Sequence, residues 1–165
     1  MTYIREFSDF PKFTQEIYRK YNRDGTPKGE EVIFAEEIIS FGAKCATFGD
    51  DTFVVASEIS KNIYFFNSRD ELFRTIEMDR VATFATSPNG KILVNVESYH
   101  IYLFNSNGDL IGFLVDYTEG QYGGNPDIVF LDDETLYVSW DLRYDPENSN
   151  ARDIYGRFIK FYEVN

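Results

Sequence analysis

The sequence is poor in the residues on which small folds and metal sites often depend. Its 165 residues include one cysteine, Cys45, one histidine, His100, and one tryptophan, Trp140. A single cysteine excludes an intrachain disulfide and favours a reducing compartment, so we expect a cytoplasmic location. A single histidine excludes a multi-histidine metal site. Cys45 lies in an apolar strand pattern, so we expect its thiol in the core rather than acting as a nucleophile.

Long apolar runs and positive charge are also scarce. No apolar stretch approaches the roughly 18 residues of a membrane span, and residues 1–6 lack the apolar segment of a secretory signal. The 16 lysines and arginines stand against 28 aspartates and glutamates, which gives a net charge of −12. This sign repels nucleic-acid phosphate and anionic lipid, so neither nucleic acid nor a membrane is expected as a partner. It favours solubility or a basic protein partner.

Aromatic residues, by contrast, are abundant. The chain has 16 phenylalanines and 12 tyrosines, and 43% of its residues are hydrophobic, which excludes a disordered chain. Aromatic side chains suit pleated, half-buried surfaces. No segment of useful length repeats apolar residues at helical spacing; residues 10–21 come nearest. The composition therefore predicts an all-β fold.

One phrase occurs twice, 38 residues apart: residues 63–70 read Ile-Tyr-Phe-Phe-Asn-Ser-Arg-Asp, and residues 101–109 read Ile-Tyr-Leu-Phe-Asn-Ser-Asn-Gly-Asp. Self-similarity at a period of this size is typical of repeat architectures. Around the second copy we expect four short antiparallel strands joined by tight turns, the last turn being an Asn-Gly hairpin whose residues tolerate positive φ. The expected strands are residues 81–86, 91–97, 101–105 and 110–117.

The same order is expected in segments 44–79 and 126–165, although the second of these supplies only three strands. Residues 1–40 hold a hairpin of residues 16–22 and 30–34, and a helical turn at residues 11–16 is an alternative there. Residues 3–7 are a candidate for the missing fourth strand beside residues 158–162. We expect one domain over residues 1–165, with blade remnants at 1–40 and blades at 44–79, 81–118 and 126–165.

Residues 81–118 resemble a blade of the WD-repeat β-propeller superfamily. The matching features are Phe84, the turn at residues 87–91, the apolar strand at residues 92–96 and the strand that ends at Phe104-Asn105. The Trp-Asp ending of that family is replaced by an aromatic and a polar residue, and its Gly-His dipeptide is absent. The resemblance implies a propeller fold and carries little information on activity.

The predicted fold class is therefore an all-β, β-propeller-like array of four-stranded antiparallel blades. The chain supplies about 3.5 blades, fewer than the 4 to 8 of a propeller. A second chain in a homo-oligomer, most simply a dimer, would complete the ring. A very small ring with one incomplete blade and an open sheet array are the alternatives.

Two long loops, residues 117–126 and 141–156, are expected on one face of the array. Long loops in compact domains are usually functional or disordered. The candidate partner-binding residues there are of the types that dominate interface hot spots, with His100 in a tight turn beside them. They are Tyr99, His100, Tyr122, Trp140, Arg143, Tyr144, Arg152 and Tyr155.

The sequence lacks a phosphate-cradling glycine loop and a calcium-loop spacing, so no catalytic residue, metal or cofactor is expected. We predict a non-enzymatic interaction module that contacts a protein partner through the long-loop face. A binding protein for a small polar ligand, such as a sugar or nucleotide, is the first alternative. A propeller hydrolase is the second.

Overall fold

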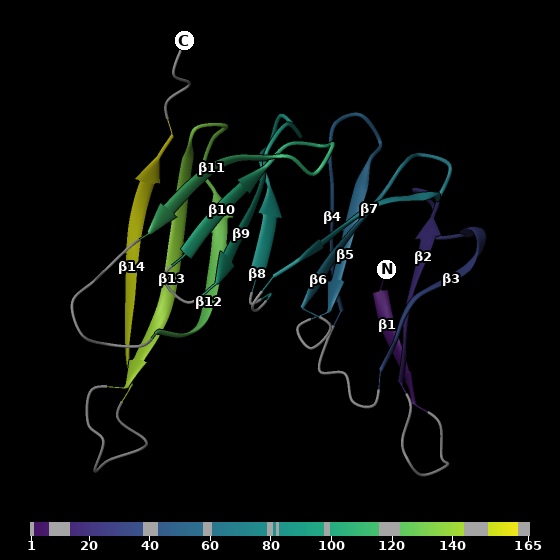
Figure 1. Cartoon of the computed structure of the whole chain (residues 1–165), viewed down its shortest axis with the longest axis horizontal. Coiled ribbons are helices and arrows are strands. Elements are labelled where there is room, and N and C mark those ends of the chain that lie inside the picture. The colour runs from purple at the N-terminus through teal and green to yellow at the C-terminus, as the bar shows by residue number, and fades with distance from the viewer. Residues whose placement is uncertain are drawn as a thin grey trace. The chain divides into compact units, whose positions relative to one another are not determined.

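The computed structural model describes residues 2–6, 14–37, 43–57, 61–78, 81, 83–97, 100–115, 123–143 and 152–161. Within these ranges every regular element is a β-strand, and no helix long and apolar enough to cross a membrane occurs. The strands form four antiparallel sheets, two of four strands and two of three, each with neighbouring strands in chain order (Figure 1). The prediction of an all-β, propeller-like array of antiparallel blades is confirmed.

The chain divides into two compact units of two sheets each. The N-terminal unit comprises Met1–Thr47 and Thr52–Val81, and the C-terminal unit comprises Phe48–Asp51 and Ala82–Asn165. The sheets of the N-terminal unit have the orders β1-β2-β3 and β4-β5-β6-β7. Their strands are β1 (Thr2–Glu6), β2 (Thr14–Tyr21), β3 (Pro27–Glu37), β4 (Ala43–Thr47), β5 (Phe53–Ser57), β6 (Asn62–Phe66) and β7 (Leu72–Glu77).

An aromatic cluster joins the two sheets of the N-terminal unit. Tyr18 of β2 packs edge-on against Phe53 and Phe66, with ring centroids 5.0 and 5.1 Å apart, and the two phenylalanines stack on each other at 5.2 Å. Val55 completes the buried set. Edge-to-face and offset pairs of this kind add to the stabilisation that burial alone provides.

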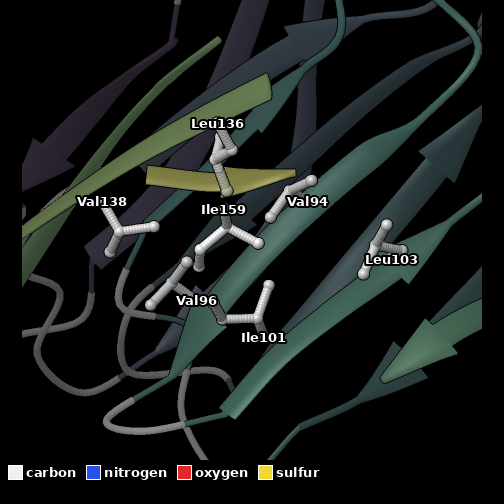
Figure 2. Close-up of a cluster of buried hydrophobic side chains, with 7 residues drawn as sticks. All are labelled: Val94, Val96, Ile101, Leu103, Leu136, Val138 and Ile159. Carbon is white, nitrogen blue, oxygen red and sulfur yellow. The ribbon is translucent and has the colours of Figure 1, made fainter. Parts of the chain in front are cut away.

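The C-terminal unit packs its two sheets through aliphatic side chains. Its strands are β8 (Thr83–Thr86), β9 (Leu93–Glu97), β10 (His100–Phe104), β11 (Leu110–Val115), β12 (Gly123–Phe130), β13 (Thr135–Arg143) and β14 (Arg152–Lys160). Figure 2 shows the cluster, in which side chains of β9 and β10 meet side chains of β13 and β14. Its members are Val94, Val96, Ile101, Leu103, Leu136, Val138 and Ile159.

In each copy of the repeated phrase, the asparagine side chain caps the turn that follows the strand. The Asn105 side-chain oxygen accepts hydrogen bonds from the backbone N–H groups of Asn107 and Asp109, at 3.0 and 2.9 Å. Asn67 accepts in the same way from Arg69 and Glu71, at 2.9 and 3.1 Å. Such side-chain caps stabilise turns because they satisfy backbone donors that the strands leave unpaired.

Each of these turns needs one residue with positive φ. Gly108 takes it at 76° in one copy, and Asp70 takes it at 67° in the other. In the Asn-Gly turn only Gly108 has positive φ, because the loop spans residues 105–109, with the Gly108 N–H bonded to the Asn105 carbonyl, instead of being a two-residue loop. The hairpin of residues 22–26 closes with the same two backbone hydrogen bonds and has Gly25 at φ 84°, so the described part of the chain contains this turn three times.

The N-terminal strand corrects one prediction. Residues 3–7 were a candidate for the fourth strand beside residues 158–162, but β1 pairs with β2, as Tyr3 opposite Ile17 shows. The two strands are joined by a short connection, which favours antiparallel pairing of neighbours. Residues 14–16 belong to β2, so the strand preferred there is confirmed; residues 11–13 lie outside the described residues.

One polar side chain is fully buried in the C-terminal unit. Asn95 of β9 has 0% exposure, and within the described part of the chain neither its amide nitrogen nor its oxygen has a hydrogen-bond partner. Asn95 is equivalent in register to Val55 of β5 and Val138 of β13. In each of the three strands, this position comes two residues after the first residue that pairs with the preceding strand. A buried amide without partners destabilises a fold by about 1–3 kcal/mol.

We therefore expect Asn95→Val to raise the free energy of unfolding by about 1–3 kcal/mol, because valine fits the equivalent positions and removes the unpaired amide. Chemical denaturation measures the change. Val138→Asn is the matched control and should lower the stability. An Asn95→Val variant less stable than the natural chain would show that the amide is satisfied.

Gly90 offers a second prediction on stability. It has φ 66°, its carbonyl oxygen accepts a 2.9 Å hydrogen bond from the N–H of Gly49, and a Cβ at position 90 would overlap the backbone of Gly49. We expect Gly90→Ala to destabilise the fold by roughly 2–4 kcal/mol, from strained φ and overlap together. Gly25→Ala, with similar φ in open space, should cost only about 1 kcal/mol. Equal losses would contradict the role of the overlap.

Candidate interaction surface

The structure describes five of the eight predicted site residues. His100 and Trp140 are described with their side chains, and both are half-buried. Arg143, Arg152 and Tyr155 are described through their backbone alone. The other three predicted residues, Tyr99, Tyr122 and Tyr144, lie outside the described residues.

The predicted loop at residues 141–156 is wrong over much of its length. Strand β13 continues to Arg143 and β14 begins at Arg152, so these two arginines are cross-strand partners. Trp140 and Tyr155 are partners in the same ladder. Polar residues continue the two strands because each backbone supplies the hydrogen bonds of the other, whatever the side chains. The loop at residues 117–126 is likewise shortened, since β12 begins at Gly123.

The ends of these strands gather on one side of the C-terminal unit. In Figure 1, β9 and β13 run downward in the view and β10 and β14 run upward, so the starts of β10 and β14 lie at the same end of the unit. His100 and Arg152 open those two strands. The prediction that they share a face therefore agrees with the strand directions.

His100 lies in a small aromatic group rather than in a turn. It is the first residue of β10, and its ring stacks on Phe113 of β11 at 5.5 Å with an interplanar angle of 24°. Tyr102 packs against the same Phe113 at 5.0 Å. Phe113 itself is 51% exposed. The sequence pattern did not identify Phe113 or Tyr102 as surface residues.

Strand β11 is an exposed apolar edge. It is the outermost strand of its sheet, and its sequence Leu-Ile-Gly-Phe-Leu-Val contains no charged residue. Four of its side chains are exposed, with Leu110 at 56% and Ile111 at 52%. Natural edge strands are usually protected by charge, proline or a covering element, because they pair readily with other chains. Leu110, Ile111, Phe113 and Leu114 are hereafter the β11 edge residues.

The equivalent strand of the other four-stranded sheet differs. Strand β7 is also at an edge, and Leu72 and Phe73 are exposed, but it carries Arg74 and Glu77 as well. Charged residues of this kind oppose pairing with another chain. The sequence does show the feature that distinguishes β11 from β7: six uncharged residues follow the Asn-Gly turn.

A second polar group lies in the N-terminal unit. The Asp70 carboxylate is 2.5 Å from the Lys20 ammonium, which also lies 4.4 Å from the centre of the Phe53 ring. The Tyr18 hydroxyl donates a long hydrogen bond of 3.4 Å to the same carboxylate. Asp70 thus combines positive φ with an ion pair.

The pKa of the Tyr18 phenol is raised well above its usual range. Burial of the ring is the main cause, the negative charge of Asp70 is the second and the hydrogen bond to Asp70 is the third. The group stays protonated at neutral pH, so it cannot act as a general base there. Its role is structural, as part of the aromatic cluster.

Cys45 is a further correction. Its thiol is exposed on β4, an edge strand, and not in the core. An edge strand lacks a neighbour on one side, so part of its inner face stays open. Within the described ranges no group of three or more histidine, cysteine, aspartate or glutamate side chains is arranged to hold a metal ion.

Comparisons with known proteins bear on the fold alone. No family model and no curated protein matches the chain. A solved structure of a protein of unknown function from Bacteroides caccae is 13% identical with a TM-score of 0.55, covering 96% of this chain and 59% of its own. This chain therefore spans about three-fifths of the length of that protein. The likeness supports the fold assigned from the sheets.

Two other solved structures are less similar to this chain in fold. A Lactobacillus plantarum protein is 14% identical with a TM-score of 0.49, covering 90% of this chain and 54% of its own. The Kluyveromyces lactis protein Hsv2 is 11% identical with a TM-score of 0.46, covering 97% and 74%. Neither assigns a ligand or partner to this chain.

The raised pKa of Tyr18 predicts a pH dependence of stability. The unfolded phenol titrates near pH 10, and the folded phenol titrates higher, so the stabilisation is complete below pH 10 and is lost as the pH rises beyond it. Unfolding by urea at several alkaline pH values should show the natural chain losing stability relative to Tyr18→Phe. A constant difference between the two chains across this range would contradict the assignment.

Proposed function

We propose that the chain is a non-enzymatic interaction module that binds an extended segment of a protein partner along strand β11. The single observation that carries the proposal is the exposed, uncharged edge formed by the β11 edge residues. A partner segment that adds as a further strand would satisfy the free backbone groups of this edge. Side chains of the added strand would supply specificity.

The chemistry of the surface suggests the character of the partner. Exposed apolar residues on both faces of β11 suit an added strand with apolar residues at successive positions, since successive side chains point to opposite faces. The net charge of −12 favours basic residues elsewhere in the segment. The aromatic rings of His100 and Tyr102 both pack on Phe113 of β11 and would add to the contact surface.

The wider predictions remain part of this proposal. The predicted contacts through Tyr99, Tyr122, Trp140, Arg143, Tyr144, Arg152 and Tyr155 would extend the surface beyond β11. The resemblance of residues 81–118 to a WD-repeat blade, which Phe84, the turn at residues 87–91 and the strand ending Phe104-Asn105 carry, is likewise part of the proposal. A cytoplasmic location is proposed from the single cysteine. The ligand-binding and hydrolase alternatives gain no support from the described residues.

The proposal predicts that charge placed on β11 abolishes partner binding. In Ile111→Lys/Phe113→Lys two lysines protect the edge and repel a basic partner. The matched control is Leu72→Lys/Phe73→Lys, which alters exposed apolar residues on β7. Proteins captured from the source cells by the natural chain should be retained by the β7 variant and lost by the β11 variant.

The contact itself is tested by placing a photo-activated cross-linking residue at position 113 and, as control, at position 73. Adducts should form with the captured protein from position 113 alone, and amide hydrogen exchange along β11 should slow in the complex. A captured protein that both double variants retain, or that cross-links equally from both positions, would exclude β11 as the binding edge.

A further inference from the structure

The sheet of β12, β13 and β14 has one covered face and one open face. Leu136, Val138 and Ile159 cover the first by packing against the neighbouring sheet (Figure 2). The ladder places Tyr137, Phe158 and Ile154 on the opposite face. There Phe158 is 68% exposed and Ile154 82% exposed. Val129 of β12, paired with Tyr137, joins them at 51%.

The open face is organised as a contact surface. The Tyr137 and Phe158 rings pack together with centroids 5.0 Å apart. Tyr137 also lies across Gly156, where a Cβ would overlap the tyrosine hydroxyl. The absence of a side chain at Gly156 therefore lets the ring lie against the sheet. The result is a broad aromatic surface of the kind that dominates protein contacts.

The same positions are buried in the two four-stranded sheets. The register equates Tyr137 and Phe158 with Val54 and Phe65 in one sheet, and with Val94 and Leu103 in the other. These four equivalents are all buried. The face that is open in the sheet of β12–β14 is therefore the face that its sister sheets cover. A repeat of this kind cannot bury both of its faces alone.

We infer that a second copy of this chain covers the open face, with the sheet of β1, β2 and β3 as the contacting surface. On the side of that sheet opposite Tyr18 and Val32, the register places Ile33, which is 46% exposed, beside Ile17, which is buried. The inference concerns a different surface from β11 and does not depend on it.

The distribution of charge supports the β1–β3 sheet of a second copy as the surface that covers the open face. On the open face the register places Lys160 beside Phe158, whereas Arg157 pairs with Val138 and belongs to the covered face. Strand β3 contains four glutamates, Glu30, Glu31, Glu36 and Glu37, against Lys28. Contact between β3 of one copy and Lys160 of the other joins opposite charges.

A head-to-tail contact is repeated in a symmetric pair, so each copy uses both of its surfaces. Light scattering and sedimentation over a wide range of concentration should therefore give twice the mass of one chain. Phe158→Asp should raise the dissociation constant about thirtyfold, the loss expected for an aromatic hot spot. Leu72→Asp, a matched exposed position on β7, should leave it unchanged.

Two further variants keep the inference testable if Phe158→Asp fails to fold, which circular dichroism and thermal melting will reveal. Lys160→Glu alters an exposed residue and should weaken the pair, with the difference from the natural chain shrinking at high salt. Ile33→Asp damages the opposite surface. A mixture of Phe158→Asp and Ile33→Asp chains retains one intact contact per pair and should associate more strongly than either variant alone.

Several outcomes would overturn the inference. A chain that is monomeric at every concentration excludes the second copy as occupant. A pair that survives both Phe158→Asp and Lys160→Glu excludes the β12–β14 face. A mixture of the Phe158→Asp and Ile33→Asp chains that associates no better than its components excludes the head-to-tail arrangement. Loss of partner capture by the β11 variant without loss of pairing would show that the two surfaces act separately.

Discussion

A sheet that is apolar on both faces must be covered on both, and this requirement governs the protein. Strand β5 shows it most simply, since Phe53 and Val55 point to one face, Val54 and Ala56 to the other, and all four are buried. A two-stranded hairpin of strands this short is at best marginally stable in isolation. Stability therefore comes from stacking sheets, which the aromatic cluster achieves in one unit and the aliphatic cluster in the other.

Much of this architecture could be predicted from the sequence because it is set by short-range chemistry. The asparagines that follow Phe66 and Phe104 mark turns, and the alternation around them marks strands. The ends of β13 and β14 could not be predicted, because their pairing continues through Asp141 and Arg152 without an alternating pattern. Their hydrogen bonds depend on the partner strand rather than on local residue type.

The exposed surface of β11 was harder to predict from the sequence. Hot-spot residue types selected the end of the C-terminal unit where His100 and Arg152 begin their strands, and a binding role for these residues stays a prediction. They did not point to Phe113 or Leu110, since an apolar strand is ordinarily assigned to the core. Only the sheet order shows that β11 is an edge. The exposure of Cys45 on β4 was missed for the same reason: the position of a strand in its sheet is a property of the whole fold.

The asparagine-capped turn also bears on how the chain acquires its structure. Each copy links neighbouring strands through bonds between residues four or fewer apart, as at Asn67 and Glu71, so the turns that close the hairpins of β2–β3, β6–β7 and β10–β11 depend on local contacts. Local contacts form early because little chain entropy is lost in closing the loop. Three hairpins with the same closure provide three separate starting points for folding, and growth can proceed from any of them toward its neighbours.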